Sequence, residues 1–371
     1  MDNNQDKRKL IEDIINGMLD WVRVVDKDNR VIFINKAMAE GLKDFKMDQL
    51  CYKLLGRDTP CENCISREAI FRGSSHMKQE IINGKIFSVM SSPVKNESGE
   101  IVAAVEVLRD ITELQLLQEK VMEQNKKLMD DLSIAKKLQC SLLPKALPED
   151  KVRFSFFYHP CEDLGGDFLD IFEIDKDHVG IYIADVSGHG VPASMLTVFL
   201  RSAIDRKNLS PSSALTKLYK DFNSSNFDHE VYITVFYAII DLRNYKIKYS
   251  NAGHNISPVL FNPSDAERFE LLRIPGIPIS NWLEKPVYTD NEISLEKFDR
   301  VFFCTDGIIE LKNKKGEQFG EDRLRNVIFN DKSDPNSTLA KIIDEATKFA
   351  EIDDFQMISD DITMALIEIK E

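Results

Sequence analysis

Long apolar runs, an excess of basic residues and a disulfide-type cysteine framework are all missing from this chain of 371 residues. The longest apolar stretch, residues 231–240, is about half of what a membrane-spanning helix needs. The first 19 residues hold no apolar run of signal-peptide length. The formal net charge of −14 disfavours nucleic acid and anionic membranes, because both attract basic surfaces. We therefore expect a cytoplasmic protein with no membrane insertion and no nucleic-acid partner.

Nucleotide-binding motifs are missing as well. The sequence has no P-loop, no GxGxxG turn and no protein-kinase motif set, which disfavours phosphoryl transfer from a nucleotide. The six cysteines are predicted to be thiols, because a chain of this class rarely relies on disulfides.

Three of the cysteines cluster in CYKLLGRDTPCENC, as Cys51, Cys61 and Cys64. A CxxC pair with a third cysteine nearby suggests a metal, an iron–sulfur cluster, another bound ligand or redox chemistry. A structural metal needs four ligands, so His76, an acidic residue or a second protomer would have to add one. The alternative is a group of packed or solvent-exposed thiols.

Three regions differ in pattern. Residues 8–112 combine short β-rich runs with helical stretches, and turn residues at 26–30 and 96–99 predict two hairpins. Residues 113–143 contain neither Gly nor Pro and are rich in helix formers. Residues 144–371 hold apolar runs that end in acidic or glycine-rich turns, which predicts buried strands followed by loops. We expect a multidomain α/β and α+β protein with boundaries at these positions.

The middle region carries an apolar residue at every seventh position. One seam consists of Leu114, Val121, Leu128, Ala135 and Leu142. A half-polar companion seam consists of Ile111, Gln118, Asn125, Leu132 and Gln139. Such heptads predict a coiled coil that joins two chains in a homodimer. The polar residues of the companion seam would lower its stability and fix the register of the two helices. The alternative is one amphipathic helix packed on its own chain.

Four aspartates lie at strand ends or in glycine-marked turns: Asp167, Asp185, Asp306 and Asp360. A single aspartate beside glycine is usually a turn residue, but a rigid scaffold can aim four strand-end side chains at one point. Converging carboxylates repel one another, and divalent cations relieve that repulsion. Oxygen donors without a His/Cys set favour Mg²⁺ or Mn²⁺. Two such ions can activate water against a phosphate ester, so the sequence predicts a phosphoester hydrolase.

Five segments of residues 145–371 carry a resemblance: GGDFLD, IADVSGHGVPASM, NAGHN, FCTDGIIELKNKKGEQFGEDRL and SDDITMALIEI. In this order they resemble SpoIIE-type phosphatases of the protein phosphatase 2C-like (PPM) superfamily. The resemblance implies an α-β-β-α sandwich with its site at one end. It also implies hydrolysis of phosphoserine or phosphothreonine on a STAS-domain anti-anti-sigma factor-like protein.

The same resemblance implies a dinuclear site with two Mn²⁺ or Mg²⁺ ions. Asp185 would bridge the ions, and the Val186 carbonyl would help to hold one. The remaining ligands, direct or through water, would be Asp167, Asp306 and Asp360, with Asp361 as the competing choice at the last position.

Other residues near these motifs have open roles. His189 in SGHG could protonate the leaving serine oxygen, or it could hold the turn. Asp170 is expected behind the metal ligands, and Arg153 is a candidate phosphate contact. Asn251 and His254 in NAGHN belong to the resemblance but receive no role from it.

The segments DWVRVVDKDNRVIFINKAMAE and GEIVAAVEVLRDITEL, within residues 8–112, resemble a PAS sensor domain with its exit into a signalling helix. The expected protein is a phosphatase that a PAS domain regulates through the linker helix. Two alternatives are a pseudophosphatase scaffold that binds a partner without hydrolysis, and a phosphoesterase for small molecules.

Overall fold

The computed structural model describes residues 2–42, 48–144, 152–282, 284–353, 355 and 358–370. Their contacts divide the chain into two compact units, Met1–Leu128 and Met129–Glu371, and the division falls within one long helix. Among the described residues, no helix is both long and apolar enough to cross a lipid bilayer.

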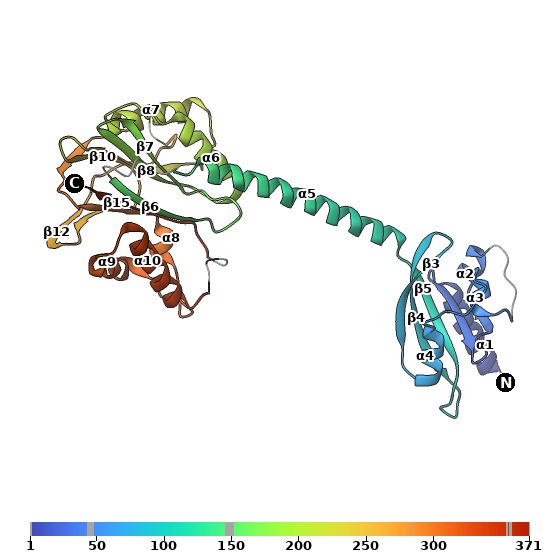
Figure 1. Cartoon of the computed structure of the whole chain (residues 1–371). Coiled ribbons are helices and arrows are strands. Elements are labelled where there is room, and N and C mark those ends of the chain that lie inside the picture. The colour runs from blue at the N-terminus through green and yellow to red at the C-terminus, as the bar shows by residue number, and fades with distance from the viewer. Residues whose placement is uncertain are drawn as a thin grey trace. The chain divides into compact units, whose positions relative to one another are not determined.

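The N-terminal unit is built on one antiparallel sheet, blue to cyan in Figure 1. Its strands, in the spatial order β2-β1-β5-β4-β3, are β1 (Trp21–Asp26), β2 (Val31–Ile34), β3 (His76–Ile82), β4 (Lys85–Lys95) and β5 (Ile101–Asp110). Its helices are α1 (Asp2–Asn16), α2 (Lys36–Gly41), α3 (Cys51–Leu54) and α4 (Ile65–Arg72). Both predicted hairpins are present, because the Asp26 and Asn96 side chains accept backbone N–H groups that close the β1–β2 and β4–β5 turns.

Helix α5 (Thr112–Leu142) covers the predicted linker. The first three positions of the apolar seam, Leu114, Val121 and Leu128, are 56%, 52% and 58% exposed. Gln139 of the companion seam is instead buried within the second unit. The two ends of the helix therefore have different surroundings: an exposed apolar seam in its first half and intramolecular contacts near its end.

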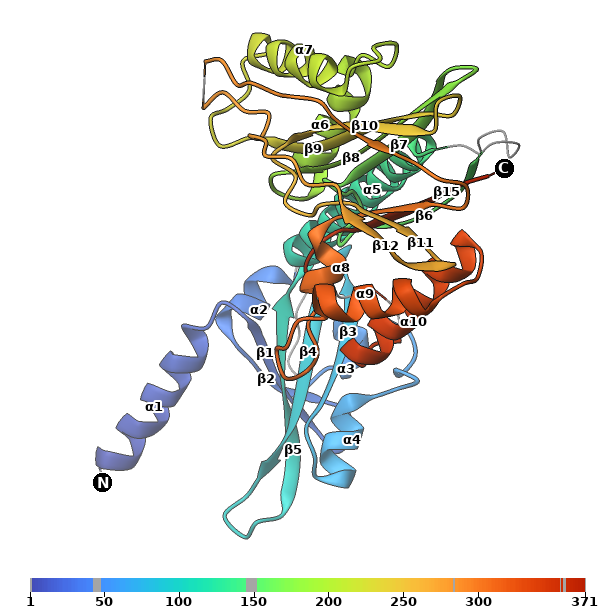
Figure 2. The same ribbon diagram turned by 90° about the vertical axis from the view of Figure 1, so that its left-hand side faces the viewer.

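The C-terminal unit has four layers, two antiparallel sheets between two layers of helices (Figure 2). The first sheet, in the order β13-β10-β9-β8-β7, consists of β7 (Phe168–Asp175), β8 (His178–Val186), β9 (Ile233–Asp241), β10 (Lys246–Ala252) and β13 (Asn291–Ser294). The second, in the order β12-β11-β14-β15-β6, consists of β6 (Val152–His159), β11 (Val259–Asn262), β12 (Asp265–Leu271), β14 (Arg300–Cys304) and β15 (Ile362–Ile369). The outer helices are α6 (Gly190–Ala203) and α7 (Pro211–Ser224) on the first sheet, and α8 (Asp306–Glu310), α9 (Gly320–Asn330) and α10 (Pro335–Ala350) on the second.

Strand β9 shows why the apolar runs of this unit are continuous. Val235 and Tyr237 face the core under α6 and α7, while Phe236 and Ala238 face the core between the two sheets. A strand covered on both faces has no polar side, so its sequence is apolar at successive positions. This arrangement confirms the predicted sandwich for the C-terminal unit.

Candidate active site

The four predicted aspartates come from segments that end at the same edge of the sandwich. Asp185 is the penultimate residue of β8, and Asp167 immediately precedes β7. Asp306 opens α8 after β14, and Asp360 stands two residues before β15. The Thr305 hydroxyl donates to Asp167 Oδ2 at 2.7 Å and so ties the two sheets together at this edge. The fold thus brings together carboxylates that are up to about 190 residues apart in the chain.

The electrostatics of this edge are unfavourable for so many charges. Burial, reinforced by the neighbouring Asp185 and Asp361, raises the pKa of Asp167 well above its usual range. Burial and the charges of Asp306, Asp360 and Asp361 raise the pKa of Asp185 to about 7. The pKa of Asp360 is raised in the same direction, first by desolvation of its carboxyl group. Each shift reports a carboxylate whose negative charge the protein alone does not compensate.

The donor chemistry fits Mg²⁺ or Mn²⁺. No lysine or arginine of the described ranges forms an ion pair with any of these aspartates, so a cation would remove an existing repulsion. Within the same ranges, no three His, Cys, Asp or Glu side chains are already gathered into a metal-binding group. Mg²⁺ keeps several waters and takes only one or two protein carboxylates, so it does not require a closed protein cage.

Asp360 and Asp361, which the sequence leaves as alternatives, have different surroundings. Asp361 is 5% exposed, and its carboxylate accepts three backbone N–H groups, from Cys161 at 2.8 Å, Gly166 at 2.6 Å and Asp167 at 3.1 Å. Its oxygens are therefore committed to holding the loop before β7. Asp360 is exposed, and its carboxylate accepts only the N–H of its neighbour among the contacts of the described residues. Asp360 is thus the more available ligand.

Glycine is required where the loops approach one another at this edge. A Cβ at Gly307 would lie 2.0 Å from the Asp361 carbonyl oxygen, and one at Gly166 would lie 3.0 Å from the Val186 carbonyl oxygen. Gly307 therefore lets α8, which carries Asp306, begin directly against the segment before β15.

The NAGHN segment, to which the sequence assigned no role, connects the two sheets through the ring of His254, which contacts Cys304 of β14 and Thr234 of β9. Burial lowers the pKa of His254, so its ring is neutral. The ring Nε2 lies 3.2 Å from the Cys304 carbonyl, which can only accept, so Nε2 carries the proton. Nδ1 lies 3.4 Å from the Thr234 hydroxyl, which donates to the Asp185 carbonyl at 3.2 Å. Asn251 closes the turn by accepting the His254 N–H at 2.7 Å.

His189 follows Asp185 by four residues and occupies the N-cap position of α6, where its side chain makes no capping hydrogen bond to the described residues of the helix. Its Nδ1 is 2.8 Å from Glu162 Oε1, and its side chain is 71% exposed. The contact with Glu162 orients the ring and leaves Nε2 as the nitrogen that could serve a leaving group. Val186 is buried at the end of β8, beside Asp185.

The comparisons with known proteins agree with this geometry. The family described as Stage II sporulation protein E (SpoIIE) matches residues 175–370, more than half of the chain. The chain belongs to the SpoIIE family. The chain is 28% identical over 186 residues to the phosphoserine phosphatase RsbP of Bacillus subtilis (strain 168), covering 48% of this chain and 45% of RsbP. It is 26% identical over 244 residues to the phosphoserine phosphatase RsbU of the same organism, covering 65% of this chain and 70% of RsbU.

The chain therefore spans less than half of the length of RsbP. Among solved structures, the SiaA-PP2C domain of Pseudomonas aeruginosa resembles it with a TM-score of 0.57 and 21% identity, over 66% of this chain and 98% of that one. This likeness concerns the fold, and it confirms a PP2C-like α/β phosphatase fold for the SpoIIE region.

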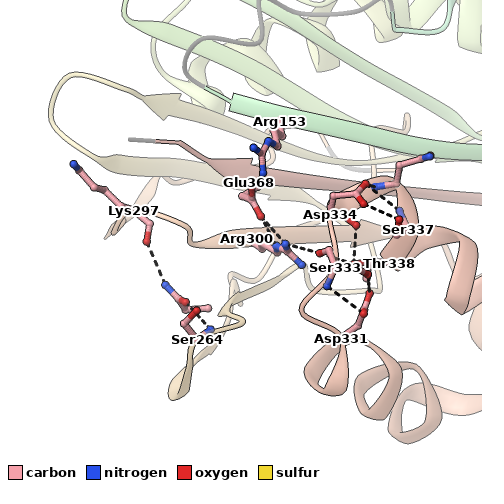
Figure 3. Close-up of polar contacts among 12 residues, drawn as sticks. Arg153, Ser264, Lys297, Arg300, Asp331, Ser333, Asp334, Ser337, Thr338 and Glu368 are labelled. Carbon is pink, nitrogen blue, oxygen red and sulfur yellow. Dashed lines mark hydrogen bonds and ion pairs between the residues drawn. The ribbon is translucent and has the colours of Figure 1, made fainter.

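Arg153 does not lie at the aspartates of the SpoIIE domain. Its Nη1 donates to Glu368 Oε1 at 3.0 Å, beside the buried Arg300, which donates to Glu368 Oε2 from Nε at 2.8 Å and Nη2 at 2.6 Å (Figure 3). Glu368 is near the end of β15, seven residues beyond Asp361, which is ~23 Å along a strand. The interpretation of Arg153 as a phosphate contact is therefore wrong, because the strand carries it to the opposite end of the sandwich.

Asp170 also has a partner away from the site. It is 2% exposed on β7, and Arg201 of α6 donates to its Oδ2 at 2.5 Å. Arg206 lies 3.4 Å from the same oxygen. Asp170 thus anchors α6 to the first sheet, and it acts behind the site as a packing residue.

Two residues that the sequence interpretation missed act on the loops of the SpoIIE site. Asn255 donates to Asp306 Oδ2 at 2.9 Å. Gln139 of α5 forms two hydrogen bonds with the backbone of Gly165: its side chain donates to the carbonyl at 2.8 Å and accepts the N–H at 3.2 Å. It also donates to Thr197 Oγ1 at 3.2 Å. Gln139 appeared only as a polar seam position, and no local signal pointed to its contact with the loop before Asp167.

In the N-terminal unit, Cys51, Cys61 and Cys64 line one small cavity of about 20 Å³ together with the buried pair Arg23–Glu106. Burial raises the pKa of Cys51 to about 11, so this thiol is protonated at neutral pH. The described ranges hold no three-ligand metal group here, His76 included. The role of the three cysteines in ligand binding or redox chemistry stays a prediction.

Proposed function

We propose that the chain is a metal-dependent serine/threonine protein phosphatase that hydrolyses phosphoserine or phosphothreonine on a STAS-domain anti-anti-sigma factor-like protein. The observation that carries the proposal is the group of uncompensated carboxylates at one edge of a PP2C-like sandwich. The names of RsbP and RsbU, both phosphoserine phosphatases, support the substrate chemistry. The test is Mn²⁺-dependent phosphate release from a phosphorylated STAS protein, with small phosphate esters as competitors.

When bound, two Mn²⁺ or Mg²⁺ ions would supply Lewis-acid polarisation of the phosphate and a water of lowered pKa. Asp167, Asp185, Asp306 and Asp360, with the Val186 carbonyl, are the proposed ligands. The remaining work falls to the protein. The fold places the carboxylates at one edge of the sandwich before loading. The imidazole of His189, oriented by Glu162, would hold a proton at Nε2 for the departing serine oxygen.

Substitutions of Asp360 and Asp361 are expected to have different effects, because we propose Asp360 as a metal ligand and Asp361 as a structural residue. We expect Asp361→Ala to destabilise the domain by about 3 kcal/mol, because it leaves buried N–H groups without an acceptor. Asp360→Ala should leave the melting temperature nearly unchanged and weaken Mn²⁺ binding at least about tenfold. Calorimetric titration with Mn²⁺ and thermal unfolding of both variants measure the two effects. Equal loss of metal affinity with equal loss of stability in both variants would contradict this division.

We also propose that the N-terminal unit is a PAS sensor domain that regulates the phosphatase through α5. At its start, α5 is joined to the sheet: Asp110 accepts from Lys85 Nζ at 2.8 Å and from the Thr112 hydroxyl at 2.6 Å, and Thr112 Oγ1 accepts the Ile86 N–H at 2.9 Å. Near its end, Gln139 holds Gly165. One continuous helix thus runs from the end of β5, the central strand of the N-terminal sheet, to the loop that precedes Asp167.

The Gln139 contact offers a direct test of this relay. We expect Gln139→Ala to lower Mn²⁺ affinity and phosphatase kcat about tenfold, because the buried Gly165 N–H and C=O lose their partners and the loop before Asp167 loosens. Gln124→Ala, an exposed position of the same helix that lies on neither seam, is the matched control and should change neither. A Gln139 variant with unaltered Mn²⁺ affinity would argue against the relay.

We propose that the exposed seam of α5 pairs with a second copy of the chain. Leu114, Val121 and Leu128 are apolar, more than half exposed and spaced by heptads. The double substitution of Val121 and Leu128 by Asp should convert a dimer of twice 42.5 kDa into a monomer in light scattering. Asp at the exposed, off-seam positions Glu119 and Lys126 is the control and should leave the dimer intact. A wild-type protein that is monomeric at micromolar concentration would refute the pairing.

A further inference from the structure

A cavity of about 170 Å³ lies in the C-terminal unit, lined by the second sheet and by helices α8 and α9. Both helices cover the same face of that sheet (Figure 2). The floor of the cavity is apolar, formed by Val259 of β11, Leu271 of β12, Phe302 of β14, and Leu324 and Ile328 of α9. An apolar cavity of about 150 Å³ is large enough to hold benzene. This cavity can therefore enclose an apolar group of about that size.

The rim of the cavity is cationic although the protein as a whole is strongly acidic. Arg273 and Arg325 both line it, together with Glu321. Arg325 Nη2 is 2.9 Å from Glu321 Oε2, so that pair is neutral in sum. Arg273 is exposed and has no ion-pair partner in the part of the chain that the structure describes. One positive charge thus remains for an anion, in a chain whose net charge is −14.

We propose that this cavity binds a small organic acid, a carboxylate attached to an apolar group about the size of a phenyl ring. The apolar floor would take the ring, and the guanidinium groups at the rim would take the carboxylate, with which arginine forms strong paired hydrogen bonds. The volume of the cavity is well below the ~300–1,000 Å³ of sites that hold drug-sized ligands, so the ligand is expected to be a smaller molecule. This binding does not rest on the phosphatase assignment.

The cavity also touches the residues that position Asp306. Asn255, which donates to Asp306 Oδ2 at 2.9 Å, lines it. Cys304, two residues before Asp306, and Ile309, on the same turn of α8, line it too. An acid in the cavity therefore packs against the back of the segment that carries one proposed metal ligand. Occupancy is expected to change the affinity of the protein for Mn²⁺, since ligands of coupled sites affect each other reciprocally.

Benzoate titrated into the full chain, followed by calorimetry and ligand-observed NMR, tests the proposal. We expect saturable binding, with benzyl alcohol and acetate each at least about tenfold weaker, because each retains only half of the recognised chemistry. Arg273→Gln combined with Arg325→Gln should weaken benzoate about tenfold or more. Glu321→Gln should strengthen it, because Arg325 is then released from its partner. Arg243→Gln, an exposed arginine away from the cavity, is the charge-matched control.

Several outcomes would overturn the proposal. These are no saturable binding at millimolar benzoate, equal binding of benzyl alcohol, or benzoate affinity that is the same in the double arginine variant. The coupling to Asp306 is measured separately, as the Mn²⁺ affinity with and without saturating benzoate, and identical values would overturn it. Because both readouts are binding measurements, their failure is distinguishable from a failure of the phosphatase assignment.

Discussion

Replacement of Asp185 by asparagine is expected to lower Mn²⁺-dependent phosphate release from a phosphorylated STAS protein by on the order of 10³-fold. Asp185 stands at the end of β8, where Asp306, Asp360 and Asp361 all act on its charge. An amide in its place keeps the shape but removes the negative charge with which Asp185 would help to hold the cations. The measurement is kcat/KM with phosphoprotein substrate, with Glu173→Gln, an exposed position of the neighbouring strand, as control.

Although Asp185→Asn should lower activity, it should stabilise the metal-free protein against unfolding. The folded-state pKa of Asp185 is about 7, above its ordinary value of 3.8, so the folded protein binds this proton more tightly than the unfolded chain. The stability of the metal-free wild type therefore falls as the pH rises from about 4 through 7. At pH 8, Asp185→Asn should raise the metal-free melting temperature by about 3 °C or more. It should also abolish the rise that Mn²⁺ causes in the wild type.

Three results would contradict the phosphatase proposal. Absence of turnover with Mn²⁺ and a phosphoprotein would favour a scaffold that binds without hydrolysis. Turnover that Asp185→Asn does not alter would place the chemistry elsewhere. Efficient competition by small phosphate esters, with no preference for phosphoprotein, would favour a phosphoesterase of small molecules.

Replacement of Glu368 by alanine is expected to destabilise the C-terminal unit by about 3–5 kcal/mol. Glu368 and Arg300 are 4% and 3% exposed, and Arg300 donates to Glu368 from both Nε and Nη2. Without Glu368 the Arg300 charge stays buried with only the Ser333 carbonyl as a described acceptor at 2.7 Å (Figure 3). Urea unfolding followed by tryptophan fluorescence measures the change.

An exposed ion pair on the first sheet provides the control for this prediction. Lys246 and Glu292 are 2.6 Å apart across β10 and β13, with side chains 45% and 41% exposed. Glu292→Ala should cost less than about 1 kcal/mol, because water screens the pair. The joint replacement of Arg300 by Met and Glu368 by Leu should recover most of the lost stability, since it removes the uncompensated charge. Equal effects at Glu368 and Glu292 would show that burial does not decide the energetics here.

Local sequence carried much of the fold because its signals act over few residues. The hairpin turn after β1 follows from Asp26, whose side chain bonds N–H groups two and four residues on. The apolar run of β9 predicted a buried strand because both of its faces are covered. The motif order predicted the SpoIIE fold, which the family match confirmed.

In the linker helix, the local pattern predicts the helix but not the contacts of its individual residues. Its heptads describe a helix with an apolar seam, and α5 is that helix. Periodicity treats every seventh position alike, yet Gln139 faces the loop at Gly165, whereas Gln118 of the same seam is exposed. What differs is the neighbour that the fold supplies, and a neighbour 26 residues away leaves no trace in the local pattern.

The sequence by itself determined that aspartates stand at the ends of buried strands, that their oxygens suit Mg²⁺ or Mn²⁺, and that a long helix precedes them. Only the tertiary structure decided the direction and partners of each side chain. It turned Asp361 to the backbone of the loop before β7 and left Asp360 exposed, and it placed Arg153 beside Glu368 at the far end of β15. The two neighbouring side chains therefore have different surroundings, and one position along the sequence separates the proposed metal ligand from a structural anchor.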